Sequence, residues 1–538
     1  MVGVTNAAMM KPAMTAPADL QWGTFPDDAP WVLQRDAIAW WADAGQLRRL
    51  ARGQVPSLIA PGRLPPGRRG VTVVARLGRA VVPWLWRRRR GRADGPEGIA
   101  ELSGRLRLAA EALGPTFIKL GQIISSGDGV FPTELVEEFK RCRDQVPAET
   151  FDDVRRTVET DLGQPLGAVF ESFSADPIAA ASIAQVHAAR LRTGEDVVVK
   201  VQRPDIARLV HTDLRAMAWL APHLVGRIPV AALANPPALV ELFADTIVEE
   251  LDFRVEAANM LDVATMLHDL GQTGYVVPRP HPTLVTRRVL VMQRLDGFKF
   301  DDVAGMREAG VDTEGVVRTA MVALMEGAMI SGIFHGDLHG GNLLVLPDGR
   351  TGLLDFGIVG RLSDDRRVAF LRLMVSATTN DLKGQMAALR DLGALPPDTD
   401  LRAVIRDLGF DQAPVDPTTL SGDQLVKEVQ RVVKGLLGYG ARMPKELMLY
   451  VKNLVFIDAA IARLAPDLDI LGEIANISMM FAQRHGAQLG RELGISEVAI
   501  DLDGVKAGFG LDPSVERITH RELQARRALI QQRMRDRR

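Results

Sequence analysis

The 538-residue sequence has few of the features that would point to a secreted, membrane-spanning or nucleic-acid-binding protein. Its single cysteine, Cys142, excludes an internal disulfide and lies in a charged helical stretch, where we expect an ordinary helix residue. The net charge of -2 gives no overall reason to expect nucleic-acid binding. The N-terminus has no basic segment followed by an apolar run, so no signal peptide is predicted.

Long apolar runs are also missing. Thr319–Phe334 and Leu447–Ala465 come nearest to a span, but charged residues interrupt both. A transmembrane helix needs about 20 predominantly apolar residues. We therefore expect two buried helices, no transmembrane helix, and a cytoplasmic protein.

One segment nevertheless suggests contact with a membrane surface. Trp84 and Trp86 lie directly before four arginines, Arg87, Arg88, Arg89 and Arg90. Indole rings favour the headgroup level of a bilayer, and arginines favour anionic lipid. The segment predicts peripheral membrane contact; the alternative is a solvated arginine run at the end of a core helix.

Two neighbouring motifs carry the clearest chemistry. His335-Gly336-Asp337 is followed by Asn342, and Asp355-Phe356-Gly357 comes after a short predicted strand pair. In kinase-fold phosphoryl transfer, one Asp orients or deprotonates the acceptor, while an Asn and a second Asp hold magnesium ions on the nucleotide phosphates. We predict Asp337 and Asn342 as catalytic residues, Asn342 and Asp355 as metal ligands, and ATP with Mg²⁺ as cofactors.

A strand and a loop upstream complete a nucleotide site. Val197–Lys200 reads as an apolar strand ending in a lysine that would contact phosphates and pair with a helix glutamate. Small residues before it would let backbone N–H groups approach phosphates, and Met292 is the candidate gatekeeper before the interlobe hinge. The predicted nucleotide contacts are Ile178, Ala179, Ala180, Ala181, Ser182, Ile183, Ala184, Gln185, Val186, Lys200, Gln293 and Leu295.

Several charged residues outside these motifs need partners if they are buried. Lys119 and Gln122 lie three apart on one face of a predicted helix. Three carboxylates, Glu250, Asp252 and Glu256, fall within two helical turns. We favour ion pairs between the lysines and these carboxylates over a snorkelling lysine and a solvated acidic face.

Taken together and in this order, the motifs resemble the UbiB (AarF, coenzyme-Q-type) atypical kinase family over about residues 100–480. The resemblance implies an α+β, two-lobed protein-kinase-like fold, with a small β-rich N-lobe, a helical C-lobe and an N-terminal helical lid extension. In such a lid Lys119 would meet Glu250 and Asp252, leaving Lys200 for Glu256. The resemblance also implies ATPase activity or transfer to a small or lipid-linked acceptor, with a hydrophobic lipid or quinone-type ligand and a role in ubiquinone biosynthesis or related metabolism.

The expected organisation follows from these assignments. It comprises a flexible N-terminal region (1–70) with a helical island at Asp36–Ala51, a helical extension with the Lys119 lid (71–150), an N-lobe with a helical insert (151–292), a helical C-lobe (293–490) and a basic C-terminal tail (491–538).

Two features argue against a phosphorylation-switched protein kinase. Gly336 replaces the arginine that grips a phosphorylated activation loop, and little chain separates Gly357 from the next helical pattern. Two other readings stay open. One is a small-molecule phosphotransferase of the aminoglycoside or choline kinase type; the other is a non-catalytic, ATP-dependent module that binds lipids or partners.

Overall fold

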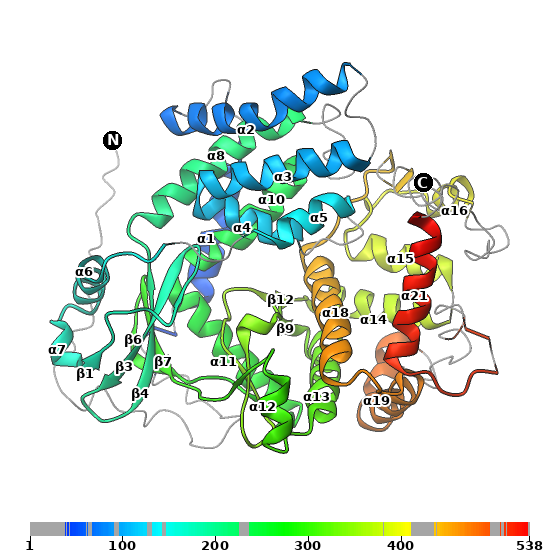
Figure 1. The fold of residues 1–538 in the computed structure, drawn as a ribbon. Helices are drawn as coiled ribbons and strands as arrows, with labels where there is room; N and C mark the ends of the chain where they lie inside the picture. The colour runs from blue at the N-terminus through cyan, green and yellow to red at the C-terminus, as the bar shows by residue number, and fades with distance from the viewer. Residues whose placement is uncertain are drawn as a thin grey trace, which may run out of the picture.

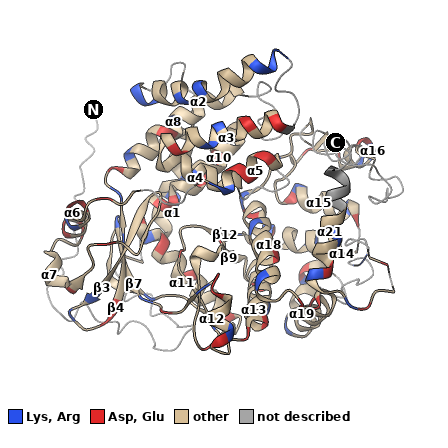
Figure 2. Ribbon diagram, viewed as in Figure 1, with Lys and Arg blue, Asp and Glu red and all other residues tan. Residues whose placement is uncertain are grey.

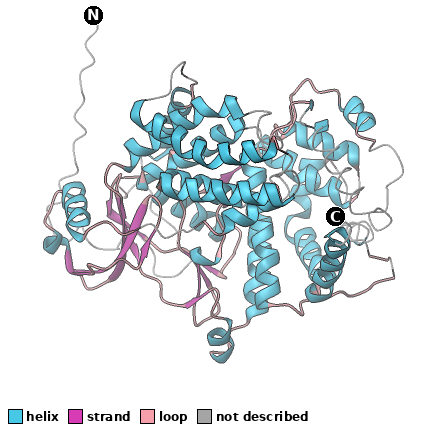
Figure 3. Ribbon diagram, turned by 45° about the horizontal axis from the view of Figure 1, so that its top comes forward, coloured by secondary structure: helices cyan, strands magenta, loops and turns pink. Residues whose placement is uncertain are grey.

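The computed structural model describes most of the chain from residue 44 onward (Figure 1). The described ranges are 44–60, 67–90, 96–125, 132–142, 147–224, 236–379, 381–409, 438–494 and 514–535, with a few single positions between them. Strands gather in one part of the molecule and helices form the rest (Figure 3). The expected α+β, two-lobed kinase-like fold is confirmed, with a sheet-bearing lobe beside a mostly helical lobe.

The N-lobe is built on one antiparallel sheet with the order β1-β3-β4-β7-β6, and β2 pairs with β3. Alternate residues of β4, Val197, Val199 and Val201, are at most 1% exposed and share a core with helix α6. The elements are α6 (Phe151–Leu162), α7 (Leu166–Val169), β1 (Phe170–Phe173), β2 (Ala179–Ala180), β3 (Ala184–Leu191), β4 (Asp196–Gln202), β6 (Pro280–Val285) and β7 (Val289–Gln293).

The apolar stretch Leu284–Met292 is not one continuous strand, because a tight turn divides it into the end of β6 and β7. Asp161 near the end of α6 fixes this turn. Its Oδ2 accepts hydrogen bonds from the Thr286 hydroxyl at 2.8 Å and from the Arg288 backbone N–H at 3.1 Å. A contact between residues so far apart in sequence leaves no local signal.

Helix α11 (Phe253–Asp269) packs against β6 and β7 and also against β9 of the C-lobe. Asp252 caps its first turn by accepting from the Arg254 N–H at 3.1 Å. Most of the helix is buried, including Glu256 and Asn259. The helix therefore runs between the lobes and carries polar groups to their junction.

The first long helix of the C-lobe is α13 (Thr313–Glu326), whose first turn is capped by Asp312. The buried helix expected over Thr319–Phe334 ends earlier, because a wider turn at Gly327–Ser331 closes it and Ile333 begins a strand. The elements are β5 (Tyr275–Val276), β8 (Phe298–Lys299), α12 (Val303–Glu308), α13 (Thr313–Glu326), β9 (Ile333–His335), β10 (Leu343–Val345), β11 (Thr351–Leu353), β12 (Val359–Arg361), α14 (Asp364–Thr378), α15 (Leu382–Asp391), α16 (Leu401–Asp407), α18 (Lys445–Leu464), α19 (Ile470–Leu493) and α21 (His520–Arg535).

A further layer of helices lies across both lobes, at the top of Figure 1. Segments from before and after the first strands meet in it, since α8 packs against both α2 and α4. Its members are α1 (Ala44–Leu58), α2 (Gly67–Arg88), α3 (Pro96–Leu113), α4 (Pro115–Ser125), α5 (Thr133–Lys140), α8 (Ile206–Leu224) and α10 (Pro236–Ile247).

The flexible region predicted over residues 1–70 lies mostly outside the described residues. Where it is described, α1 continues past Ala51 to Leu58 and packs against α11. Arg48 of α1 lies 3.1 Å from Asp262, and Arg52 pairs with Glu249. These ion pairs tie the N-terminal layer to the lobe junction.

The membrane prediction fails at Trp84, which is 1% exposed and donates from its indole N–H to the Gly98 carbonyl at 2.8 Å. Trp86 on the same helix is 58% exposed, and the Arg90 guanidinium lies 3.4 Å from its ring centre. The ribbon of α2 carries several basic positions, coloured blue in Figure 2. Among the described residues, no helix has the length and apolar character needed to cross a bilayer.

The two tryptophans give a matched test of this packing. Trp84→Ala should lower the free energy of unfolding by about 3–5 kcal/mol, since it leaves a cavity where a large buried side chain was. Trp86→Ala should cost less than about 1 kcal/mol, because only an exposed cation–π contact is lost. Urea unfolding of both variants measures the difference, and equal losses would contradict the assignment.

Candidate active site

The predicted catalytic loop joins β9 to β10 and is fixed by its own polar groups. His335 donates from Nε2 to the Asp355 carbonyl, while its Nδ1 accepts from the Asp337 N–H at 3.2 Å. Burial lowers the pKa of His335 below its usual value, so the ring is neutral, as this pair of hydrogen bonds requires. The amide of Asn342 donates to the Asp337 carbonyl at 3.1 Å. Asp337, Asn342 and Asp355 are thus brought together by the backbone around them.

Lys200 at the middle of β4 reaches across the lobe junction. Its Nζ lies 2.7 Å from Glu256 Oε1 on α11 and 3.1 Å from Asp355 Oδ2. The Gly357 N–H donates to the other oxygen of Asp355 at 2.9 Å. The Lys200–Glu256 pair expected from the resemblance is therefore present, and the Asp355 side chain still keeps 43% of its surface exposed.

Charge governs ionisation at this junction. Burial would lower the pKa of Lys200, but Asp355 and Glu256 outweigh it and raise that pKa. Burial would likewise raise the pKa of Asp355, but the charges of Lys200 and Lys119 hold it well below its usual range. For Glu256, burial outweighs Lys200 and raises the pKa to about 7. Asp355 is therefore ionised at any working pH and is suited to bind a cation.

Helix α4 brings Lys119 to the same junction from outside the two lobes. Lys119 Nζ lies 3.0 Å from Glu250 Oε1, and Asp337 and Asp355 also help to raise its pKa against the effect of burial. Gly121, two residues on, lets α4 approach α5, because a Cβ at this position would lie 2.6 Å from the Phe139 ring. Gln122 is half-buried one position further along the helix.

The pairing of Lys119 with Asp252 is wrong. Asp252 caps α11 and forms an ion pair with Arg254 at 2.7 Å. Its extended backbone, with φ of -139°, places the side chain at the helix start. Glu250 lies in the short turn before that cap and reaches Lys119 instead.

The alanine loop forms a short hairpin beside the junction. Ala179 and Ala180 pair with β3, and the Ala181 N–H donates to the Ala184 carbonyl at 2.8 Å. Arg203 holds the loop by donating from Nε to the Ala181 carbonyl at 3.0 Å. Ile178 is 59% exposed at the start of this hairpin.

Some predicted nucleotide contacts have structural partners of their own. Ser182, Ile183 and Gln185 are buried, and Gln185 Oε1 accepts from the Glu149 N–H at 2.8 Å. Gln293 at the end of β7 accepts from the Arg279 N–H at 3.4 Å. The contacts of this hairpin and of Gln293 and Leu295 with a nucleotide stay a prediction.

Sequence reasoning missed Lys452 and Asn453 of α18. Lys452 forms an ion pair with Asp337, and Asn453 Oδ1 accepts from the Leu338 N–H at 3.1 Å. Burial would raise the pKa of Asp337, but Lys452 and Lys119 lower it to about 2. A lone lysine in the apolar run Leu447–Ala465 was the available signal, since an isolated cation there needs a partner.

The oxygen groups at the junction suit magnesium held together with nucleotide phosphates. The side-chain N–H of Asn342 is bound to the Asp337 carbonyl, which leaves the Asn342 side-chain oxygen as a possible ligand. This oxygen and the exposed carboxylate of Asp355 are hard ligands of the kind that Mg²⁺ prefers. Among the residues that the structure describes, no three His, Cys, Asp or Glu side chains form a metal cluster by themselves. Phosphate oxygens and water would supply the remaining ligands of a magnesium ion held by Asn342 and Asp355.

Comparison with known proteins gives consistent matches. The ABC1 atypical kinase-like domain family matches residues 141–389. The uncharacterised protein Rv0647c of Mycobacterium tuberculosis is 36% identical, over 70% of this chain and 79% of its own length. An Arabidopsis thaliana chloroplast protein, named as an uncharacterised aarF domain-containing protein kinase, is 34% identical over 68% of this chain and 72% of its own. The "probable protein kinase UbiB" of Marinobacter nauticus is 32% identical over 70% and 69%.

Lys452 provides a test with a defined pH dependence. Because the folded-state pKa of Asp337 is lowered from 3.8 to about 2, the stability it contributes is present above about pH 4 and is lost as pH falls toward 2. Lys452→Met should therefore cost about 2 kcal/mol at pH 7 and progressively less toward about pH 3.

Urea unfolding of both proteins across this pH range measures the gap. Arg463→Met, an exposed position on the same helix, is the control and should show no such trend. A gap that is independent of pH would mean that Lys452 does not act through Asp337.

Proposed function

The chain belongs to the UbiB/AarF family of atypical kinase-like proteins, and we propose that it binds Mg-ATP and acts as an ATPase or phosphotransferase in isoprenoid-quinone or related lipid metabolism. The observation that carries this proposal is the position of Lys200, 2.7 Å from Glu256 and 3.1 Å from Asp355. A buried lysine held by a helix carboxylate beside an exposed aspartate is the arrangement that orients nucleotide phosphates next to a magnesium site.

Each residue has a role that follows from its surroundings. Lys200 would bind and orient the phosphates, and Asn342 and Asp355 would hold magnesium, which neutralises phosphate charge when bound. Asp337 would position a water molecule or an acceptor hydroxyl. Its lowered pKa makes it a positioning group and hydrogen-bond acceptor rather than a strong base, because a carboxylate with a pKa of about 2 binds protons weakly.

The acceptor is limited by the lid. Helix α4 places Lys119 against Glu250, with Asp337 and Asp355 close enough for their charges to raise its pKa. A folded helix in this position leaves little room for a peptide substrate, which supports water or a small or lipid-linked acceptor. The same closed lid also fits a non-catalytic module that binds nucleotide and recruits lipids or partners, and turnover separates the two.

The proposed membrane contact is restricted to the exposed end of α2. Trp86 and the arginines Arg88, Arg89 and Arg90 are exposed at the end of α2. We propose that this end of α2, without the buried Trp84, touches an anionic lipid surface.

The metal assignment can be tested on Asp355. Asp355→Asn should weaken Mg-ADP binding at least about tenfold and reduce Mg-dependent ATP hydrolysis by a similar factor, because a charged ligand is lost. Asp348→Asn, at the exposed turn of the same β10–β11 hairpin, is the control and should match wild type. Isothermal titration calorimetry and phosphate release provide the measurements, and unchanged Mg-ADP affinity in Asp355→Asn would contradict the proposal.

The lid can be tested on its ion pair. Lys119→Met leaves Glu250 buried without its cation and should cost about 3–5 kcal/mol of stability. The double variant Lys119→Met/Glu250→Gln should recover most of this loss, because no unpaired charge remains. Both variants should shift the ratio of ATP to ADP affinity, by about threefold or more, if the lid controls the nucleotide.

Lys140→Met, which breaks an exposed pair on α5, is the control for this series. The stabilities could follow the expected pattern while the ratio of ATP to ADP affinity stays unchanged. This result would show that Lys119 supports the fold and does not regulate the site.

A further inference from the structure

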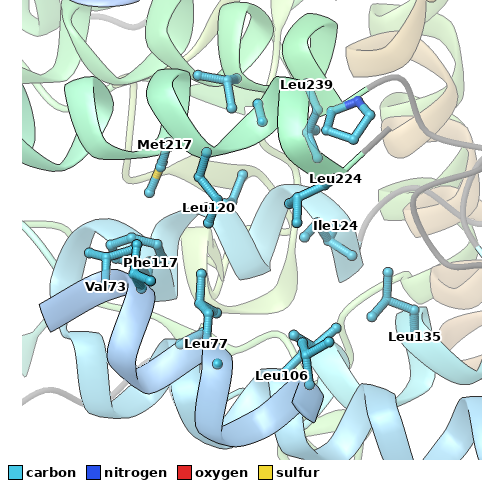
Figure 4. Close-up of a pocket in the computed structure, with 18 of the residues that line it drawn as sticks. Val73, Leu77, Leu106, Phe117, Leu120, Ile124, Leu135, Met217, Leu224 and Leu239 are labelled. Atoms are coloured by element: carbon cyan, nitrogen blue, oxygen red, sulfur yellow. The ribbon is translucent and has the colours of Figure 1, made fainter. Parts of the chain in front are cut away.

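The helical layer contains a half-open cavity of about 360 Å³, lined by residues of α2, α3, α4, α5, α8 and α10 (Figure 4). Every lining residue is apolar. Protein interiors are close-packed and rarely leave voids of this size, whereas pockets for small molecules begin at about 300 Å³. A much smaller apolar cavity, of about 150 Å³, stays dry and binds benzene. The cavity is therefore large enough for a ligand, and among the described residues no lining side chain offers it a hydrogen bond.

The lining of the cavity extends along two helices of the layer. On α2 its lining extends from Val73 to Val82, nine residues along a helix, which corresponds to about 14 Å. On α4 it extends from Phe117 to Ile124, or about 10 Å. An apolar space with walls of this length can hold an extended hydrocarbon chain.

The side chains that stay exposed locate the mouth. Val74 and Val82 line the cavity and are 38% and 61% exposed, and Gly78 lies between them on the same helix face. The next residue, Arg79, is exposed and forms no ion pair with the residues that the structure describes. The helix has no acidic residue along its whole length. An anionic group near this part of α2 would therefore meet positive charge and no acidic residue of the helix.

We propose that this cavity is a binding site for the hydrocarbon chain of an amphiphile with an anionic head group. The chain lies along α2 between α4, α8 and α10, and the head group meets Arg79 at the mouth. Transfer of a chain from water supplies the binding energy, at about 0.8 kcal/mol for each buried CH₂. The charge at the mouth fixes which end of the amphiphile enters.

Gly78 allows the cavity to be filled without disturbing the fold. A Cβ at Gly78 would meet no atom within 4 Å, and its φ is that of an ordinary helix. Gly78→Leu should therefore place a side chain in the empty space and raise helix propensity. Gly53→Leu on α1 is the matched control, since Gly53 is exposed, has equally free surroundings and does not line the cavity.

Binding is measured on the full chain without nucleotide, by titration with palmitate and by displacement of the fluorescent probe N-phenyl-1-naphthylamine. We expect saturable binding to wild type and to Gly53→Leu, and at least about tenfold weaker binding to Gly78→Leu. Thermal unfolding should show that both variants are folded. Leu106→Phe fills the cavity from α3 and should act like Gly78→Leu. The proposal would be overturned if wild type showed no saturable binding, or if both filled variants bound the ligand as tightly as wild type.

The head group and the source of the chain have separate tests. Arg79→Gln should weaken the binding of palmitate several-fold and leave the binding of the neutral hexadecanol unchanged. An equal effect on both ligands would overturn the role of Arg79.

Phosphatidylglycerol vesicles that displace the probe from wild type, and not from Gly78→Leu, would identify membrane lipid as the source of the bound chain. Displacement by free palmitate alone would identify a soluble amphiphile. Trp86→Ala should affect vesicle association but not palmitate binding. All these readouts are independent of Mg-ADP binding at Asp355.

Discussion

The contact of Lys200 with Glu256 and Asp355 is the interaction on which the rest of the structure depends. It joins the N-lobe sheet, the helix between the lobes and the loop after β11, which are far apart in sequence. A lysine with 9% of its side chain exposed is tolerable only where carboxylates surround it. Helix α11 secures the same loop twice more: Glu256 accepts from the Phe356 N–H, and Asn259 donates to the Phe356 carbonyl at 2.8 Å. The lobes are therefore held in one relative position by the groups that would bind a nucleotide.

The carboxylates around this contact are balanced by neighbouring lysines. Three carboxylates, Glu250, Asp337 and Asp355, lie close enough to influence one another, and each has a lysine neighbour. Without cations, such a group would share protons and its pKa values would rise. The lysines keep the two aspartates ionised, so the site is ready for a divalent cation. Asp355 would hold magnesium, and Lys200, which keeps Glu256 as its second partner, would bind the phosphates.

The parts of the site that the sequence predicts are those fixed by short spacing. Asp337 and Asn342 share one loop, and a lysine ending an apolar strand has to find a carboxylate, so Lys200 with Glu256 followed from chemistry and resemblance. Lys452, Trp84 and the turn at Thr286 depend on partners that only the folded chain supplies. Asp252 lies close in sequence to Glu250, and the resemblance assigns both to the same lysine. In the structure its carboxylate caps helix α11 and pairs with Arg254 instead, because helix capping competes for the same group.

Helix α4 contacts both the candidate active site and the apolar cavity. Lys119 faces the carboxylates, Gly121 meets Phe139 of α5, and Leu120 faces the apolar cavity on the next side of the helix. Any movement that withdrew Lys119 would also separate Gly121 from Phe139 and change the wall of the cavity. The position of the lid is therefore set jointly by an ion pair of modest net energy and by apolar packing at about 25 cal/mol for each Å² buried. Because packing is short-ranged and stiff, it fixes where Lys119 lies, and electrostatics fixes what it contacts.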